Sequence, residues 1–122
     1  MYVNISSSLE ETAALLHLLG QPNRLAMLLV IGEREICVCH LEALLQERQA
    51  VISQNLMALR KRGLVITRRS GRHIFYRLAD ARLLDVLRQA ALTAGICLDE
   101  SQYNQPIPGC ICPFCSGVDT CA

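Results

Sequence analysis

The sequence predicts a mainly α-helical fold with one β-hairpin, in the order α-α-α-α-β-β-α. Amphipathic helical stripes occur on both sides of two short alternating segments that flank Gly71, and this pattern predicts the order of the elements. The composition, 52% hydrophobic but only 4% aromatic and without tryptophan, is typical of packed helices. A chain of 122 residues fits one domain. We expect that domain to span 1–98, followed by a cysteine-rich tail over 99–122.

The first two helices are delimited by turn and capping residues. Ser8 is expected to cap the first helix, which carries an apolar stripe from Leu9 towards Gly20. Pro22 suits the first position of the second helix, where no backbone N–H is needed, and Gly32 suits its end.

The next two helices form a closely spaced pair. The segment 35–46 supplies one apolar face, and a turn at Glu47-Arg48 separates it from a helix over 49–62. In that second helix Ile52, Leu56 and Leu59 share one face, while polar residues cover the other. Two short helices with a tight turn, the second exposing polar side chains, predict a helix-turn-helix.

A hairpin and a last helix complete the domain. Residues 64–67 and 74–77 alternate like paired strands, and 68–73 is expected to join them as a basic loop. Residues 80–95 carry a leucine stripe that predicts the last helix. A helix-turn-helix followed by such a hairpin predicts a winged helix-turn-helix.

The cations are concentrated in this region. Residues 48–79 hold eight of the twelve Lys and Arg residues and no carboxylate, so the net charge of +1 hides a local +8. A segment that carries only positive charges indicates a surface that binds nucleic acid. Polar side chains on the helix suit base edges, and the hairpin cations suit phosphates or the minor groove. The residues expected to contact double-stranded DNA are Gln49, Ala50, Ser53, Gln54, Arg60, Lys61, Arg68, Arg69, Arg72 and His73.

Residues 9–95 resemble the ArsR/SmtB family of bacterial winged-helix repressors. The matching segments are L-G-Q-P-N-R-L, E-I-C-V-C-H-L, I-S-Q-N-L-M-A-L-R-K-R-G-L-V and R-R-S-G-R-H-I-F-Y-R-L. The resemblance implies a homodimer that joins through its first and last helices and binds an imperfect palindromic operator. Asn55 stands where the family often has histidine, and we expect altered packing there.

The cysteines are expected to be metal ligands. The N-terminus has no signal-peptide pattern, and the longest apolar run, Leu25 to Ile31, is too short for a membrane span. We therefore expect a cytoplasmic protein with reduced thiols and no membrane partner. The candidate ligands are Cys37, Cys39, Cys110, Cys112 and Cys115, with Cys97 and Cys121 as further candidates.

The two groups of cysteines differ in spacing. Cys37 and Cys39 lie 200° apart on a regular helix, so both sulfurs meet one ion only if the backbone there is extended. The C-x-C-x-x-C of Cys110, Cys112 and Cys115 is a compact thiolate spacing.

In the resembled family, E-L-C-V-C-D-L marks members that answer to arsenite and antimonite, or to cadmium and lead. Here His40 replaces the aspartate, and Glu42 stands where some arsenite-binding members have a third cysteine. The leading prediction is a repressor released by As(III) or Sb(III), with Cd(II) or Pb(II) as the alternative inducer and no organic cofactor.

Other functions fit the sequence less well. A thiol switch for oxidants or reactive sulfur, using a dithiol such as Cys97 with another cysteine, remains an alternative. Zinc, nickel or cobalt sensing on the last helix is not expected, since that segment has no histidine and only Asp85. Neither an enzyme nor a metal carrier is predicted, because each would leave the +8 stretch without a role.

Overall fold

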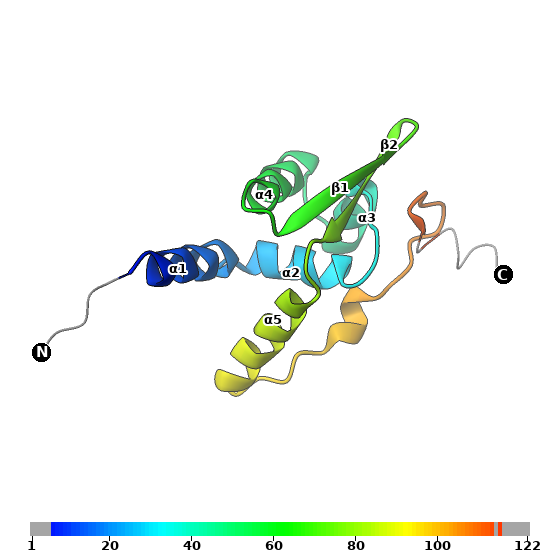
Figure 1. Cartoon of the computed structure of the whole chain (residues 1–122). Coiled ribbons are helices and arrows are strands. Elements are labelled where there is room, and N and C mark those ends of the chain that lie inside the picture. Colours follow the sequence, from blue (N-terminus) through cyan, green and yellow to red (C-terminus); the bar gives the residue numbers. More distant parts are fainter. Residues whose placement is uncertain (1–5, 114, 116–122) are drawn as a thin grey trace, which may run out of the picture.

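The computed structural model describes residues 6–113 and 115 and confirms the predicted winged helix-turn-helix. Figure 1 shows α2 in the middle, with α3, α4 and the hairpin on one side and α5 on the other. The elements are α1 (Ser7–Leu19), α2 (Pro22–Ile31), α3 (Val38–Leu45), α4 (Gln49–Lys61), β1 (Val65–Ser70), β2 (His73–Leu78), α5 (Arg82–Thr93) and the 3₁₀ helix η1 (Glu100–Tyr103).

Helix α2 forms the centre of the core. Pro22 begins it and Gly32 ends it, as expected; Gly32 has a φ of 53° and donates its N–H to Leu28 O at 2.9 Å. The five consecutive residues from Met27 to Ile31 are all buried, which requires neighbours around the whole helix. Those neighbours are α3, β2, α5 and η1. The other elements are therefore positioned by their packing on α2.

Helix α1 extends away from this core (Figure 1), and Leu19 is its one buried residue. The predicted cap at Ser8 is wrong: the Ser6 hydroxyl accepts the Leu9 N–H at 3.4 Å, so the helix begins earlier. No single helix in the part of the chain that the structure describes is long and apolar enough to cross a membrane. Helices α1 and α2 reach that length and composition only together, as a pair bent by 87°.

The third helix begins later than expected because its predicted first turn is extended backbone. Ile36 exchanges two backbone hydrogen bonds with Tyr76 of β2, at 2.8 and 2.9 Å, and so adds a short third strand to the hairpin. Cys37 is then the N-cap of α3, with φ −88° and ψ 165°. Gln46, with a φ of 53°, makes the turn into α4.

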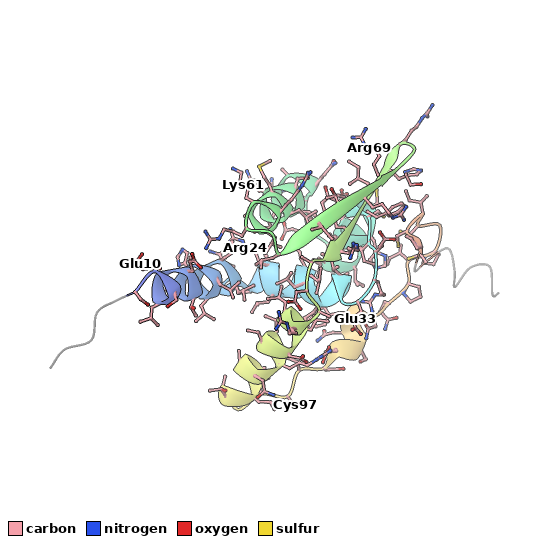
Figure 2. All side chains as sticks on the ribbon, in the orientation of Figure 1. Glu10, Arg24, Glu33, Lys61, Arg69 and Cys97 are labelled. Atoms are coloured by element: carbon pink, nitrogen blue, oxygen red, sulfur yellow. The ribbon has the colours of Figure 1, made fainter. Side chains whose placement is uncertain are left out.

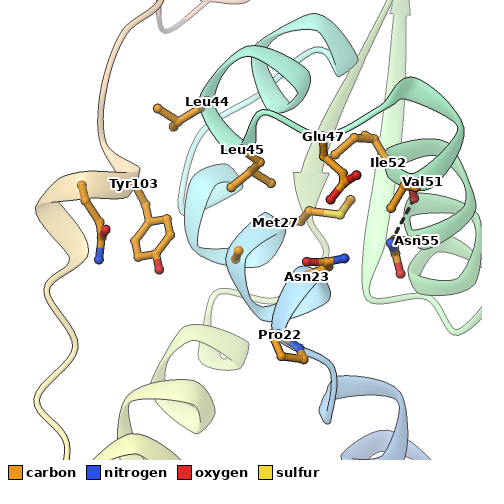
Figure 3. A pocket seen from close by; sticks show the side chains of 12 residues that line it. Pro22, Asn23, Met27, Leu44, Leu45, Glu47, Val51, Ile52, Asn55 and Tyr103 are labelled. Atoms are coloured by element: carbon orange, nitrogen blue, oxygen red, sulfur yellow. Dashed lines mark hydrogen bonds between the residues drawn. The ribbon is translucent and has the colours of Figure 1, made fainter.

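Asn55 lies on the inward flank of α4, as expected. Its amide nitrogen donates to Val51 O at 2.9 Å (Figure 3), and its amide oxygen accepts from Arg24 Nε at 3.0 Å. Arg24 also donates to Leu18 O at 3.0 Å, so one guanidinium joins α4 to the junction of α1 and α2. Beside Asn55, residues of α2, α3, α4 and η1 line a cavity of about 400 Å³ (Figure 3).

The hairpin is longer than predicted. The strands pair in register from Val65 opposite Leu78 to Ser70 opposite His73, which leaves Gly71-Arg72 as the turn. The expected loop over 68–73 is therefore wrong, since most of it belongs to the strands. Gly71 has a φ of 60° at the first turn position, which is where a type II′ turn requires glycine.

The last helix and the tail are tied back to the core. Asp80 precedes α5 and accepts the Arg82 N–H at 2.9 Å, so α5 begins two residues later than expected. Beyond α5, Arg88 forms a bidentate pair with Glu100, with both N–O distances 2.9 Å. Arg34, just beyond α2, donates to Asn104 Oδ1 at 2.6 Å and to Tyr103 O at 3.4 Å. The predicted tail over 99–122 thus begins with η1, next to the domain core.

We predict that Leu28→Ala lowers the free energy of unfolding by about 2–5 kcal/mol, because Leu28 is fully buried in α2. Met57 is 59% exposed on α4 and provides the matched control. Met57→Ala should change the free energy of unfolding by less than about 0.5 kcal/mol. Urea unfolding at one protein concentration measures both. Equal losses in the two variants would contradict the central role of α2.

Candidate metal centre and nucleic-acid interface

Four side chains converge where the tail meets α3. The ligand atoms of His40, Cys110, Cys112 and Cys115 all lie within 4.8 Å of one another. His40 Nδ1 lies 3.1 Å from Cys115 Sγ, 3.6 Å from Cys112 Sγ and 3.8 Å from Cys110 Sγ. Cys110 Sγ is also 3.4 Å from Cys112 Sγ and 3.3 Å from Cys37 Sγ. We call these five residues the sulfur cluster.

The beginning of α3 determines which of its residues reach the cluster. Cys37 is the N-cap, and His40 lies three residues later, which places both on the same face of the helix. Cys39, in the first turn, lies on a different face and is exposed. Extended backbone at Cys37 thus brings one of the two α3 cysteines to the tail, and the second points elsewhere.

The tail segment is shaped so that its sulfurs point inward. Gly109 has a φ of 78°, and the Cys110 N–H donates to Ile107 O at 3.1 Å. The Ile107 N–H donates to Cys115 Sγ at 3.2 Å, and the Cys112 N–H donates to the sulfur of Cys110. Backbone N–H groups that point at sulfur stabilise thiolates, which are the metal-binding form of cysteine.

The sulfur cluster is nearly closed to solvent. Cys112 and Cys115 are fully buried, and His40 and Cys37 are 1% and 4% exposed. Burial raises the pKa of the Cys110 and Cys115 thiols and lowers the pKa of His40. Burial therefore favours the neutral thiols of Cys110 and Cys115 and the neutral imidazole of His40. Thiolates at these positions need a compensating positive charge.

One positive charge lies beside the cluster. The Arg34 guanidinium is close enough to Cys112 and Cys115 for their charges to interact, although burial lowers its pKa overall. It is held there by Val30 O at 2.5 Å and by its bonds to the tail. An anionic set of thiolates would therefore be partly neutralised by Arg34.

These residues fit a thiophilic ion. Zn–S and Zn–N bonds of about 2.3 and 2.0–2.1 Å give donor separations of about 3.8 and 3.6 Å in a tetrahedron. The observed separations of 3.1–3.8 Å between His40 Nδ1 and the tail sulfurs are near these values. Three thiols and an imidazole are also the donor types that soft and borderline ions prefer.

The structure thus brings some of the sequence-predicted ligands together and leaves others apart. Cys37, Cys110, Cys112 and Cys115 are brought together, whereas Cys39 and Cys97 are exposed and outside the sulfur cluster. Figure 2 shows Cys97 beyond the end of α5. Cys121 lies outside the described residues. His40 was missed as a ligand, and its position three residues after Cys37 was the signal that could have found it.

The candidate DNA-contacting residues lie on α4 and the hairpin. Lys61 and Arg69 extend to the same side of the molecule in Figure 2. Each of these candidates is exposed, as are all eight cations of residues 48–79. The candidates are Gln49, Ala50, Ser53, Gln54, Arg60, Lys61, Arg68, Arg69, Arg72 and His73.

Arg68 differs from the other seven cations of this stretch. It forms a bidentate salt bridge with Glu35, at 2.8 and 3.0 Å, and lies 5.0 Å from the centre of the Phe75 ring. Within the described residues, the other seven form no salt bridge. The hydrogen bond between the two groups lowers the pKa of Glu35 and raises that of Arg68.

Comparison with known proteins agrees with this arrangement. Residues 21–67 match the family described as "Bacterial regulatory protein, arsR family". The biofilm growth-associated repressor of Agrobacterium fabrum is 45% identical over 80 residues, which are 63% of this chain and 68% of that protein. The HTH-type transcriptional repressor SmtB of Mycobacterium tuberculosis is 38% identical over 87 residues, 71% of this chain and 64% of that protein.

A solved structure has the same fold. The transcriptional repressor BigR of Xylella fastidiosa superposes with a TM-score of 0.63 at 35% identity, over 72% of this chain and 90% of that one. Sequence and structure thus agree over the helices and the hairpin, and the matched segments cover about two thirds of the curated relatives' own lengths. The chain therefore belongs to the ArsR/SmtB family of bacterial transcriptional regulators, which are DNA-binding proteins and not enzymes.

Proposed function

We propose that this chain is a cytoplasmic, homodimeric repressor that leaves its operator when a thiophilic metal or metalloid binds the sulfur cluster. The observation that carries the proposal is the 3.3 Å separation of Cys37 Sγ and Cys110 Sγ. It joins the N-cap of the helix-turn-helix to the thiol-rich tail. Ion binding at this point acts directly on the helix pair that reads DNA.

On operator DNA, α4 would enter the major groove and the hairpin would follow the backbone. Gln49, Ser53 and Gln54 are exposed on α4 and suit base edges. The exposed cations at the end of α4 and on the hairpin suit phosphates. Two protomers would present two such helices to an imperfect palindrome.

The dimer would form through α1 and α5. Both helices carry exposed apolar side chains, namely Leu9 and Leu16 on α1 and Val86 and Leu92 on α5. Between them lies a largely apolar cavity of about 380 Å³, lined by residues of α1, α2 and α5. A contiguous apolar surface of this kind is costly in water and favours a second copy as its cover.

The leading inducers are As(III) and Sb(III), with Cd(II) and Pb(II) as the alternative. Cys37, Cys110 and Cys112 supply three thiols with successive sulfur separations of 3.3 and 3.4 Å, and trivalent arsenic binds three thiolates in a pyramid. A redox switch is the second candidate, favoured by the same short Cys37–Cys110 contact. Release by oxidant in metal-free buffer would identify the redox switch.

Three consecutive residues connect the sulfur cluster to the hairpin. Glu35 forms the salt bridge with Arg68 of β1, and Ile36 pairs with Tyr76 of β2. Cys37 then contacts Cys110. A displacement of Cys37 upon ion binding would therefore be transmitted to both strands of the hairpin, and α3 would move with it. A coupling of about 1–3 kcal/mol would lower operator affinity about 5- to 150-fold.

We predict that Gln54→Ala weakens binding to the operator by about 1–3 kcal/mol, because a glutamine on the outward face can form two bonds with adenine. Gln102→Ala, an exposed glutamine on η1, is the matched control and should bind as the unaltered chain does. Fluorescence anisotropy with an operator selected from random DNA measures both. If Gln54→Ala binds with unchanged affinity, α4 does not read bases at this position.

We predict that Cys37→Ser binds the operator normally but is no longer released by arsenite, because the thiol nearest Cys110 is removed. Cys39→Ser should be released as the unaltered chain is, since Cys39 is exposed outside the sulfur cluster. Gel-shift titration with arsenite, antimonite, cadmium and lead side by side tests both variants. Normal release of Cys37→Ser by arsenite would place the inducer elsewhere.

We predict that Glu35→Gln reduces the loss of operator affinity caused by arsenite at least about threefold, because the neutral amide cannot form the bidentate salt bridge with Arg68. Without arsenite its operator affinity should rise by less than about fivefold, since one carboxylate beside the basic surface is lost. Glu33→Gln, an exposed residue of the same loop, is the control (Figure 2). An unchanged response of Glu35→Gln would exclude this link as the route of coupling.

A further inference from the structure

The sulfur cluster contains five donors, which is more than a three- or four-coordinate ion requires. The ligand atoms of His40, Cys110, Cys112 and Cys115 all lie within 4.8 Å of one another, and Cys37 Sγ lies 3.3 Å from Cys110 Sγ. We propose that the cluster holds two overlapping sites. His40, Cys110, Cys112 and Cys115 bind a four-coordinate divalent ion such as Cd²⁺ or Zn²⁺, and Cys37, Cys110 and Cys112 bind trivalent arsenic or antimony.

The geometry separates the two sites. His40 Nδ1 is within 3.1–3.8 Å of all three tail sulfurs, as the fourth corner of a tetrahedron would be. Cys37 Sγ lies 3.3 Å from Cys110 Sγ, and it extends the Cys110–Cys112 pair to three thiols. Trivalent arsenic or antimony bound by three thiolates does not need an imidazole ligand, whereas a borderline divalent ion binds imidazole well.

The net charge of the bound ion and its ligands also distinguishes the two sites. A divalent ion with three thiolates and a neutral histidine carries one net negative charge, and Arg34 lies beside Cys112 and Cys115 to offset it. Trivalent arsenic with three thiolates is neutral and needs no such partner. The position of Arg34 therefore favours the set that contains His40 for divalent ions.

The contacts that position the donor atoms also differ between the two sites. Cys115 contacts both His40 and the Ile107 N–H, which orients it towards the histidine. Cys37 belongs to α3 and is continuous with the residues that contact the hairpin. The two ion classes therefore share two tail thiols, and they differ in whether they engage the N-cap of α3. The assignment of Cys37 to the inducer rests on the proposed function, whereas the divalent site does not.

The test measures ion binding directly, in the reduced full-length chain without DNA. His40→Asn should weaken Cd²⁺ binding, measured in competition with a chelator, by at least about tenfold, since even residues that only support a ligand contribute this much. Its arsenite binding should stay within about twofold. Cys37→Ser should weaken arsenite binding at least about tenfold and leave Cd²⁺ binding within about threefold. Cys39→Ser should change neither.

A spectroscopic measurement on the unaltered chain tests the two sites without requiring that any variant folds. X-ray absorption of the zinc-loaded chain should show three sulfurs and one nitrogen, and that of the arsenite-loaded chain three sulfurs. Four sulfurs around zinc, unchanged Cd²⁺ binding by His40→Asn, or unchanged arsenite binding by Cys37→Ser would overturn the proposal. Failure of operator release alone would instead overturn the proposed function, because these measurements contain no DNA.

Discussion

The contact between Cys37 and Cys110 joins two segments that are 73 positions apart in the chain. It depends on a local feature of α3, because only the extended N-cap conformation at Cys37 directs its side chain towards the tail. Had α3 begun two residues earlier, Cys37 would have been an ordinary helical residue. The β-bridge between Ile36 and Tyr76 prevents that earlier start by holding the preceding backbone in the sheet. Hairpin, helix and sulfur cluster are thus mutually dependent.

Two arginines at opposite ends of α2 connect this centre to the rest of the fold. Arg24 bonds α4 through Asn55 and the α1–α2 junction through Leu18 O. Arg34 holds the tail through Asn104 and lies beside the buried thiols. Each is partly buried, where a hydrogen bond to a charged donor contributes more than at the surface. The central helix therefore positions both α4 and the segment that carries Cys110, Cys112 and Cys115.

The fold was predictable from the sequence wherever a single residue type controls the local backbone. Pro22 and Gly32 set the limits of α2, and the apolar face of α4 was evident from its helical period. The hairpin was underestimated, because Arg68 and Arg69 are paired in β1 although no apolar alternation marks them. Strand pairing depends on the partner strand, which a local pattern does not contain.

The sulfur cluster was predictable in part. The C-x-C-x-x-C spacing indicated a thiolate site, yet the path of the tail back to α3 depends on Arg34, whose partner Asn104 lies 70 positions away in the sequence. His40 was not predicted as a ligand, because in the sequence it is only a replacement for the aspartate of the resembled motif. Its place among the thiols becomes evident only once the tail lies beside it.

The wide separation of the donors along the chain has a consequence for biosynthesis. Residues 22–78, which build the central helix, the helix pair and the hairpin, leave the ribosome before Cys110 does, since synthesis is N-terminal first. The helix-turn-helix and the hairpin are thus able to fold while the chain is still nascent. The tail cysteines are synthesised later, so the sulfur cluster is completed only after its α3 residues are already in place.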